Sequence, residues 1–344
     1  MLVAKKRKKE RKEWIITKGR LSRWQRERRI SRYIVIGASL VIAAIIGVIA
    51  YGYYDSEVKP FHQTVIRVND KTFDMSYYIK MLRFYWISGG QNPSMLDLLS
   101  DQVINLIEND ELIRQEASKL GLKATAEEID NKIRQQFSPP EKEKSEGSAE
   151  KENSKQLFEK FLKRVQLTEE EYRELIATDI LRKKLQDYIG REKVPEKVPQ
   201  IKVEGILVDK KDLDTVKAKL KAGESLSSLA EKFSKYSGSK GNKADLGWIP
   251  KGIMGEDFDK VAFKLKPGVL SEPISVAGGE RYWFIKVLKK EEARKLEQSQ
   301  REILEAQAFS QWFAEEKKKN QIEDYFTEKL KSWAIDKVSK KASK

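Results

Sequence analysis

The chain has 344 residues, a net charge of +15, one histidine and no cysteine. That length has room for two or three domains, and the missing cysteine excludes disulfide scaffolds, thiol nucleophiles and cysteine-based metal sites. The sole histidine, His62, lies beside Pro60 and Phe61. Histidine metal clusters and Ser-His triads are therefore not expected, and we predict neither a metal nor a cofactor.

The positive charge is concentrated at the N-terminus. Residues 1–32 hold 14 Lys or Arg against three Glu, for +11, which leaves +4 for the rest of the chain. A uniformly basic chain would indicate nucleic-acid binding, whereas a basic segment before an apolar run indicates membrane topology. The second interpretation fits, and no specific nucleic-acid partner is expected.

The apolar run extends from Tyr33 to Tyr54 and contains no charged residue. As a helix it would be about 33 Å long, enough for a hydrocarbon core of about 30 Å. A cleaved signal peptide is the alternative, since Val48 and Ala50 could form a small-residue cleavage site. The long basic leader favours a retained single span, with the N-terminus in the cytoplasm and the later residues outside.

Helices are predicted after a short strand and turn at residues 64–70. Apolar residues at three- and four-residue steps between Leu99 and Leu120 indicate one helix. Two capping boxes, Thr125 with Glu128 and Thr168 with Glu171, mark the starts of two more. Between these two helices, residues 138–155 are rich in Glu, Lys, Ser and Pro and lack bulky apolar side chains. We predict a disordered insertion there.

A different kind of segment begins after Pro195 and Pro199, which break the preceding helix and stiffen a linker. Residues 200–290 indicate strands, turns and short helices. Helix is predicted again after Lys290, with Leu296, Ile303, Ala306 and Phe313 on one stripe, followed by a final helix or strand-helix piece. Gly205 stands in the middle of a predicted strand, where glycine packs nothing and costs stability.

The mixed segment carries a family's sequence pattern. It contains "ILV" in its first strand, "KAGESLSSLAEKFS", "DLGW" at Asp245–Trp248, "GIMGEDFDKVAFKLKPG", "SEPI" and a final "IKV" strand. These motifs, over about ninety residues, resemble the parvulin-type peptidyl-prolyl isomerases. The flanking helices resemble the chaperone domains of the SurA, PrsA and PpiD families.

The resemblance implies an α+β protein in which helical N- and C-terminal segments form a SurA-like chaperone domain around a parvulin-like domain. The expected divisions follow the chain. They are a basic leader (1–32), a transmembrane helix (33–54), a helical chaperone domain (60–198), a parvulin-like PpiC domain (199–290) and a C-terminal helical segment packed on the chaperone domain (291–344).

By resemblance, an apolar slot for a proline ring is formed by Leu246, Met254 and Phe258, although the same side chains could simply pack in a core. Family members usually carry two histidines and a Cys or Asp beside this slot. The matching positions here hold Gly205, Trp283 and Tyr236. No catalytic residue is therefore predicted. We expect Trp283 to lean into the space over Gly205, as a volume-conserving replacement of the polar network.

The leading interpretation is a membrane-anchored, extracytoplasmic folding factor of the parvulin family that binds unfolded or proline-containing exported polypeptides. It predicts chaperone activity in preference to strong isomerase activity. One alternative is an active isomerase that uses the apolar slot alone. Another is a tethered adaptor whose basic leader binds ribosomes or anionic lipid. The sequence does not specify an oligomeric state.

Overall fold

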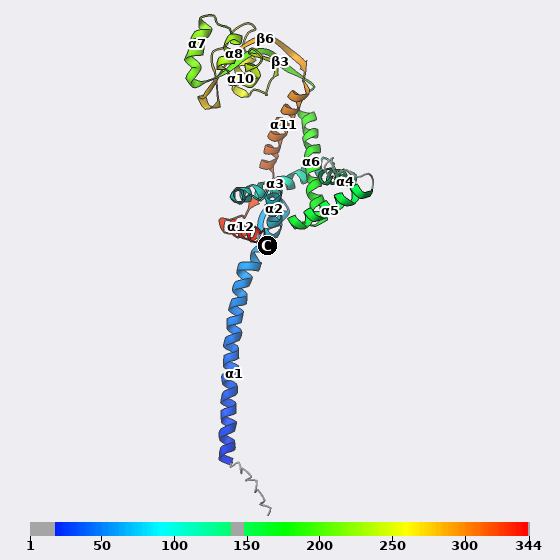
Figure 1. Cartoon of the computed structure of the whole chain (residues 1–344), viewed down its shortest axis with the longest axis vertical. Helices are drawn as coiled ribbons and strands as arrows, with labels where there is room; N and C mark the ends of the chain where they lie inside the picture. Colours follow the sequence, from blue (N-terminus) through cyan, green and yellow to red (C-terminus); the bar gives the residue numbers. More distant parts are fainter. Residues whose placement is uncertain (1–17, 139–147, 343–344) are drawn as a thin grey trace, which may run out of the picture. The chain divides into compact units, whose positions relative to one another are not determined.

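The computed structural model describes residues 18–138 and 148–342 and contains both helices and sheets (Figure 1). The predicted α+β class is confirmed. The chain divides into two compact units. One contains the residues up to 65 together with 73–79 and those from 325 onward, and the other contains 66–72 and 80–324.

The first unit contains the apolar N-terminal helix. Helix α1 (Lys18–Tyr53) continues through a π-helical turn (Tyr54–Val58) and a 3-10 turn (Lys59–His62). Among the described residues it is the one helix that is long and apolar enough to cross a membrane, and none of its apolar window is buried. Its length agrees with the predicted span.

The C-terminus belongs to the same unit. Helix α12 (Glu328–Ala342) lies against the turns that follow α1. The Tyr325 N–H donates to the Val65 carbonyl at 2.9 Å, and the rings of Tyr78 and Phe326 lie 4.6 Å apart. The C-terminal segment is therefore joined by packing and by hydrogen bonds to the residues that follow α1.

A small sheet has the strand order β2-β1-β7. Its strands are β1 (Thr64–Val68), β2 (Lys71–Asp74) and β7 (Ile322–Asp324). Ile66 pairs with Asp324 and Val68 with Ile322, in antiparallel register. The predicted strand and turn near residue 65 are thus confirmed, and the final piece of the chain has the strand-helix form.

Several helices form the first part of the second unit. They are α3 (Leu96–Lys119), α4 (Ala126–Phe137), α5 (Ser148–Val165) and α6 (Glu169–Lys193), preceded by the end of α2 (Met75–Ser88). Both predicted capping boxes form. Thr125 accepts from the Glu128 N–H at 3.2 Å, and Thr168 accepts from the Glu171 N–H at 3.1 Å. Each glutamate carboxylate accepts the cap residue's N–H in return, which satisfies two end donors per helix.

Helix α5 begins inside the segment predicted to be disordered. It starts at Ser148, whereas the prediction covered residues 138–155, so the prediction is wrong for residues 148–155. Residues 139–147 of that segment lie outside the described residues. The polar start of α5 contains Ala, Glu and Lys, which favour helix. The same helix continues to turns that carry the buried Phe158 and Leu162.

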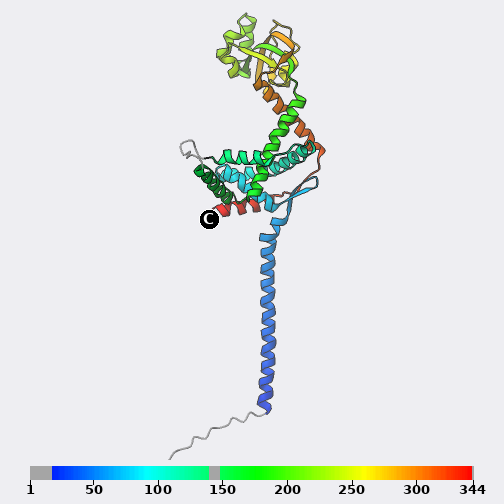
Figure 2. The ribbon, with the colours of Figure 1, turned by 90° about the vertical axis from the view of Figure 1, so that its right-hand side faces the viewer.

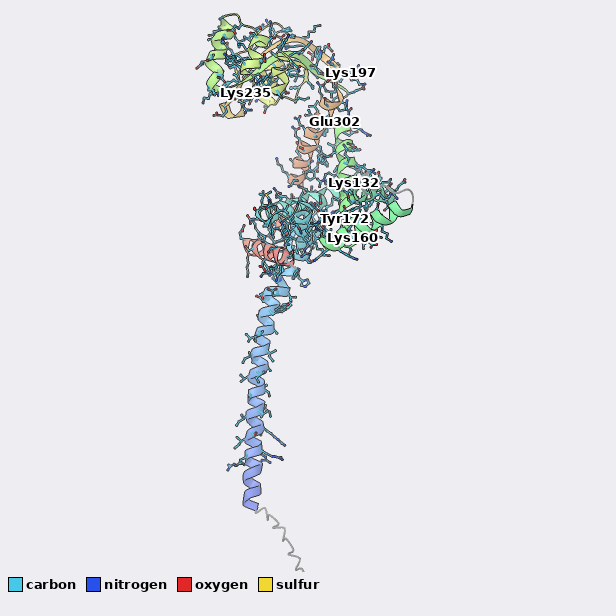
Figure 3. The ribbon with its side chains drawn as sticks, in the orientation of Figure 1. Lys132, Lys160, Tyr172, Lys197, Lys235 and Glu302 are labelled. Atoms are coloured by element: carbon cyan, nitrogen blue, oxygen red, sulfur yellow. The ribbon has the colours of Figure 1, made fainter. Side chains whose placement is uncertain are left out.

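Aromatic rings hold α4, α5 and α6 together. Tyr172 on α6, which is labelled in Figure 3, is the centre of this cluster. Its ring lies 5.5 Å from those of Phe158 and Phe161 and 6.1 Å from those of Phe84 and Phe137. Such edge and tilted arrangements add stability beyond the burial of apolar area.

Helix α11 (Gln298–Lys319) returns along α6, and the two lie side by side in Figures 1 and 2. Phe309 packs with Ile113, Leu185 and Ile189 in a shared core. The helices approach each other closely at Gly190, where an added Cβ would lie 2.9 Å from the Glu305 Cβ. Helix α11 therefore packs on α3 and α6 through this core.

The mixed segment forms a four-stranded antiparallel sheet of order β4-β3-β6-β5. The strands are β3 (Lys197–Asp209), β4 (Asp245–Pro250), β5 (Ile274–Val276) and β6 (Arg281–Lys295). One face packs with helices α7 (Leu213–Lys221) and α8 (Leu226–Phe233), and the other with α10 (Glu256–Ala262). A short helix, α9 (Ser237–Lys240), precedes β4.

Strands β3 and β6 are longer than predicted. Helix was expected directly after Lys290, but β6 continues to Lys295 and pairs there with Lys197. Pro199, expected in a linker, lies inside β3 where the register shifts, which is a position that tolerates a residue without an N–H. Backbone pairing between distant segments overrides the local helix preference here.

Candidate peptide-binding site

Gly205 lies on the face of β3 that carries Val203 and Leu207, opposite Ile285 of β6. The space above it is filled. An added Cβ would lie 2.9 Å from Leu246 Cδ1 and 3.0 Å from Ile285 Cγ2. The expectation that Trp283 fills this space is wrong, because the side chains nearest to it are Leu246 and Ile285. A Cβ at residue 205 would require one of those two side chains to move.

Trp283 instead pairs with Leu207, two residues further along β3. It is 4% exposed, and its indole makes edge contacts with two rings. The Tyr236 ring lies 5.3 Å away at 65°, and the Phe258 ring 5.7 Å away at 80°. Tyr236, Trp283 and Phe258 therefore form an aromatic row that runs from the surface into the core.

Tyr236 is the exposed end of this row, at 38% exposure. Its ring lies directly over Gly238, where an added Cβ would be 2.6 Å from Tyr236 Cε1. Gly238 therefore permits the position of the ring, and the sequence analysis did not identify it. The signal in the sequence for this role of Gly238 is its position two residues after the aromatic Tyr236.

Two buried hydroxyl groups hold the backbone beneath Tyr236. The Oγ atoms of Ser234 and Ser239 lie 2.6 Å apart, and Ser239 Oγ donates to the Tyr236 carbonyl at 3.0 Å. The Tyr236 N–H donates to Ser234 Oγ at 3.3 Å. These bonds use the serine hydroxyls for structure and fix the loop from which Tyr236 projects.

Leu246, Met254 and Phe258, the predicted slot residues, lie at different depths. All three contact one apolar core, but Phe258 is fully buried whereas Leu246 and Met254 are half-buried. Phe258 therefore supports the site from below and presents no surface to a peptide. Burial of this kind depends on how α10 packs against the sheet, which residue type alone does not indicate.

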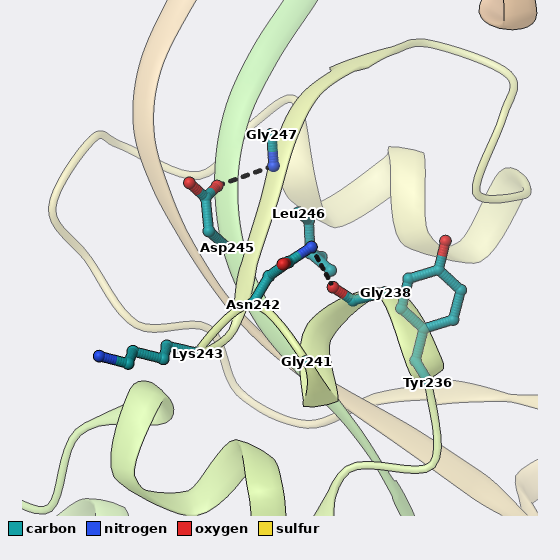
Figure 4. Close-up of a pocket in the computed structure, with 8 residues that line it drawn as sticks. All are labelled: Tyr236, Gly238, Gly241, Asn242, Lys243, Asp245, Leu246 and Gly247. Atoms are coloured by element: carbon teal, nitrogen blue, oxygen red, sulfur yellow. Dashed lines mark hydrogen bonds between the residues drawn. The ribbon is translucent and has the colours of Figure 1, made fainter.

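A pocket of about 560 Å³ opens beside Leu246 (Figure 4). Leu246 is the predicted slot residue that lines it; Met254 and Phe258 do not. The lining residues are Tyr236, Gly238, Gly241, Asn242, Lys243, Asp245, Leu246 and Gly247. The site thus combines one aromatic and one aliphatic side chain with a polar rim.

The rim is shaped by a tight turn between α9 and β4. Lys243 and Ala244 have φ angles of 50° and 69°, in the left-handed region. Asn242 Nδ2 donates to the Gly238 carbonyl at 3.1 Å, and the Asp245 carboxylate accepts from the Gly247 N–H at 2.8 Å (Figure 4). Asn242 and Asp245 therefore stabilise the rim, while the Lys243 ammonium is the cationic group among the residues lining the pocket.

Asp259 fixes the neighbouring loop that carries Met254. It is 7% exposed, and one carboxylate oxygen accepts from the Gly252 N–H at 2.7 Å. Burial raises the pKa of Asp259 above its ordinary value, and the Gly252 N–H only partly opposes this shift. The other carboxylate oxygen is buried without a hydrogen-bond partner among the described residues.

The chemistry available at the site is therefore non-covalent. Rotation about a peptidyl-prolyl bond needs no nucleophile but must overcome about 18–20 kcal/mol. Gly205, Trp283 and Tyr236 contribute no side chain, an indole and a phenol. No group of three or more metal-ligating side chains occurs among the described residues.

Two segments of the chain match models of known protein families. Residues 208–287 match the family model of the PPIC-type PPIase domain, and residues 24–186 match that of the SurA-like N-terminal domain. These matches identify a PPIC-type PPIase domain and a SurA-like N-terminal domain within the chain.

Curated relatives that match part of the chain are named foldase protein PrsA. The protein from Geobacillus kaustophilus is 37% identical over 144 residues, which are 38% of this chain and 49% of that protein. The Bacillus subtilis protein is 44% identical over 107 residues, 30% of this chain and 35% of that protein. A crystal structure of PrsA from Bacillus anthracis aligns with a TM-score of 0.40 and 20% identity, covering 69% of this chain and 95% of that chain. The chain spans about half the length of the first two curated relatives it matches.

Proposed function

We propose that this protein is a membrane-anchored folding factor that binds unfolded, proline-containing polypeptides outside the cytoplasm, with chaperone activity exceeding isomerase activity. One feature of the site supports the preference for chaperone over isomerase activity. Gly205, Trp283 and Tyr236 occupy the positions at which the parvulin family places its histidines and its Cys or Asp. The burial of Trp283 and the cover of Leu246 over Gly205 support a site without that polar network.

Binding a proline-containing peptide requires fewer groups at the site than catalysing its isomerisation does. A proline ring is apolar and rigid, so contact with the Tyr236 ring and the Leu246 side chain would hold it without ordering a flexible chain. Lowering the rotation barrier also requires polar groups that favour the twisted amide over the planar one. The Asn242 and Asp245 side chains at the rim are already engaged in backbone hydrogen bonds.

The membrane part of the proposal rests on α1 and the charge before it. The helix has an exposed apolar window, and the 14 Lys or Arg of residues 1–32 precede the uncharged run Tyr33–Tyr54. This asymmetry favours an N-terminus inside and a body outside. Retention of the helix, rather than its removal as a signal peptide, is part of the proposal. So is the division of the chain into a helical chaperone domain and a parvulin-like domain, although the sheet extends beyond the expected limits of 199 and 290 to Lys197 and Lys295.

Two assays on the full chain in detergent test the proposal. Suppression of aggregation of an unfolded client measures binding, and NMR exchange of a proline-containing peptide measures isomerisation. We expect clear suppression with an exchange rate close to that of the peptide alone. An exchange rate raised by orders of magnitude would instead establish an active isomerase. The matched comparison is the double variant Gly205→His/Trp283→His, which returns both imidazoles.

A further inference from the structure

The C-terminal helix lies against the chain where it leaves the apolar run. Trp333 on α12 donates its indole N–H to the Ser56 carbonyl at 2.8 Å. Its ring meets the Phe61 ring edge-on, with 4.7 Å between centroids. Lys337, one turn further along, forms an ion pair with Glu57. These contacts attach α12 to residues 56–61, directly after Tyr54.

This attachment sets the depth of α12 relative to a bilayer that α1 would span. Ser56 and Glu57 are two and three residues beyond Tyr54, which is about 3–5 Å of helix. The headgroup layer on each side of a bilayer is about 5–7 Å thick. The point at which α12 touches the juxtamembrane segment therefore falls within the headgroup layer.

The direction and composition of α12 fit the same place. In both Figure 1 and Figure 2 it runs across the axis of α1, so it would lie parallel to a membrane plane. It holds five lysines against one Glu and one Asp, and Lys329 and Lys340 are exposed. Trp333 is a residue type enriched at membrane interfaces, and exposed Tyr51, Tyr53 and Tyr54 lie at the end of the apolar run.

We propose that α12 is an interfacial helix that binds the anionic phosphate headgroups of the outer leaflet. This inference rests on the proposed membrane anchor, because α1 brings α12 to the bilayer surface. A lysine near an anionic surface contributes about 1 kcal/mol, which is about a five-fold preference for an anionic over a neutral lipid. The helix would thus attach the body to the membrane at a second point beside the span.

The absence of cysteine allows a direct test on the full chain. Ser332→Cys, at an exposed position of α12, carries an NBD fluorophore in vesicles of phosphatidylcholine and phosphatidylglycerol. The ratio of quenching by headgroup-labelled phosphatidylglycerol to that by headgroup-labelled phosphatidylcholine reports the local preference for anionic lipid. We expect a ratio of about five or more, falling toward one in high salt.

Two sets of variants make the outcome specific. Lys329→Gln/Lys340→Gln should bring the ratio toward one, whereas Lys329→Arg/Lys340→Arg keeps the charge and should preserve it. Gly47→Cys, whose position on α1 has no neighbouring atoms within 4 Å, reports insertion through quenching by acyl-chain labels. Quenching at 47 without quenching at 332, or a ratio unaffected by the Gln variant, would overturn the inference and leave the anchor standing. No quenching at 47 would overturn the anchor and the inference with it.

Discussion

The Leu246 side chain occupies the space that a side chain at Gly205 would need, with Cδ1 2.9 Å from the position of an added Cβ. Leu246 also lines the pocket. A change at residue 205 is therefore transmitted to a residue that a bound peptide would touch. Stability of the sheet and shape of the pocket are coupled through this one contact.

Gly205→His should destabilise the mixed domain. Ile285 Cγ2, on a stiff β-branched side chain, lies 3.0 Å from the new Cβ, and overpacking of this kind costs about 1–3 kcal/mol. Denaturant unfolding followed by tryptophan fluorescence measures the loss. Leu246→Ala should reduce the penalty, because it removes the nearer of the two obstructing atoms. An equal penalty in both backgrounds would show that Leu246 is not the obstacle.

Trp283→Ala should lower the free energy of unfolding by about 3–5 kcal/mol, as expected for a buried tryptophan. The change removes both ring contacts, to Tyr236 and to Phe258, and leaves a cavity in the core. Trp283→Phe is the matched control and should retain most of the stability because a ring remains. If alanine and phenylalanine were equally harmful, the indole N–H would matter more than the packing of the row.

Tyr236→Ala should weaken binding of a proline-containing peptide about five-fold, since one aromatic contact contributes about 1 kcal/mol. The affinity is measured by fluorescence anisotropy of a labelled peptide on the full chain. Tyr236→Phe keeps the ring over Gly238 and should bind as the unmodified protein does. Unchanged affinity in the alanine variant would remove Tyr236 from the binding site.

Asp259 should make the mixed domain relatively more stable in acid. Its folded-state pKa is raised by burial, so the folded protein holds the proton more tightly than the unfolded chain. This contribution is fully present below the unfolded pKa of about 3.9 and is lost as the pH rises through the folded pKa. Unfolding measured from acid to neutral pH should show the loss.

Asp259→Asn is the control for that pH dependence. The amide oxygen can still accept from the Gly252 N–H, but the group cannot ionise. The difference in unfolding free energy between the variant and the unmodified protein should therefore shift in favour of asparagine as the pH rises. A difference that stayed constant with pH would assign the dependence to other groups.

Local signals predicted the parts of the fold that depend on neighbouring residues. The two capping boxes place the starts of α4 and α6 correctly, and the motifs around Trp248 identify the parvulin-like domain. Contacts between segments that are distant in the sequence could not be predicted from local signals. That Leu246 covers Gly205 follows from the pairing of β3 with both β4 and β6, and the burial of Phe258 follows from the docking of α10.

The extension of β6 was missed for the same reason. Residues 291–295 have no strong strand preference of their own, and they are strand because β3 provides backbone partners. The start of α5 differs from expectation because residues 138–155 are polar as a whole. Their last part, from Ser148, is nevertheless continuous with a helix whose later turns carry apolar side chains.

The pairing of Lys197 with Lys295 places the first and last residues of the mixed domain beside each other. A module that enters and leaves through adjacent strands can be exchanged or deleted with little disturbance to its host, because a short hairpin could close the gap. Helices α6 and α11 keep their own shared core around Phe309. Evolution, or an engineer, could therefore replace the rotamase-like insert while the helical framework that carries it continued to fold.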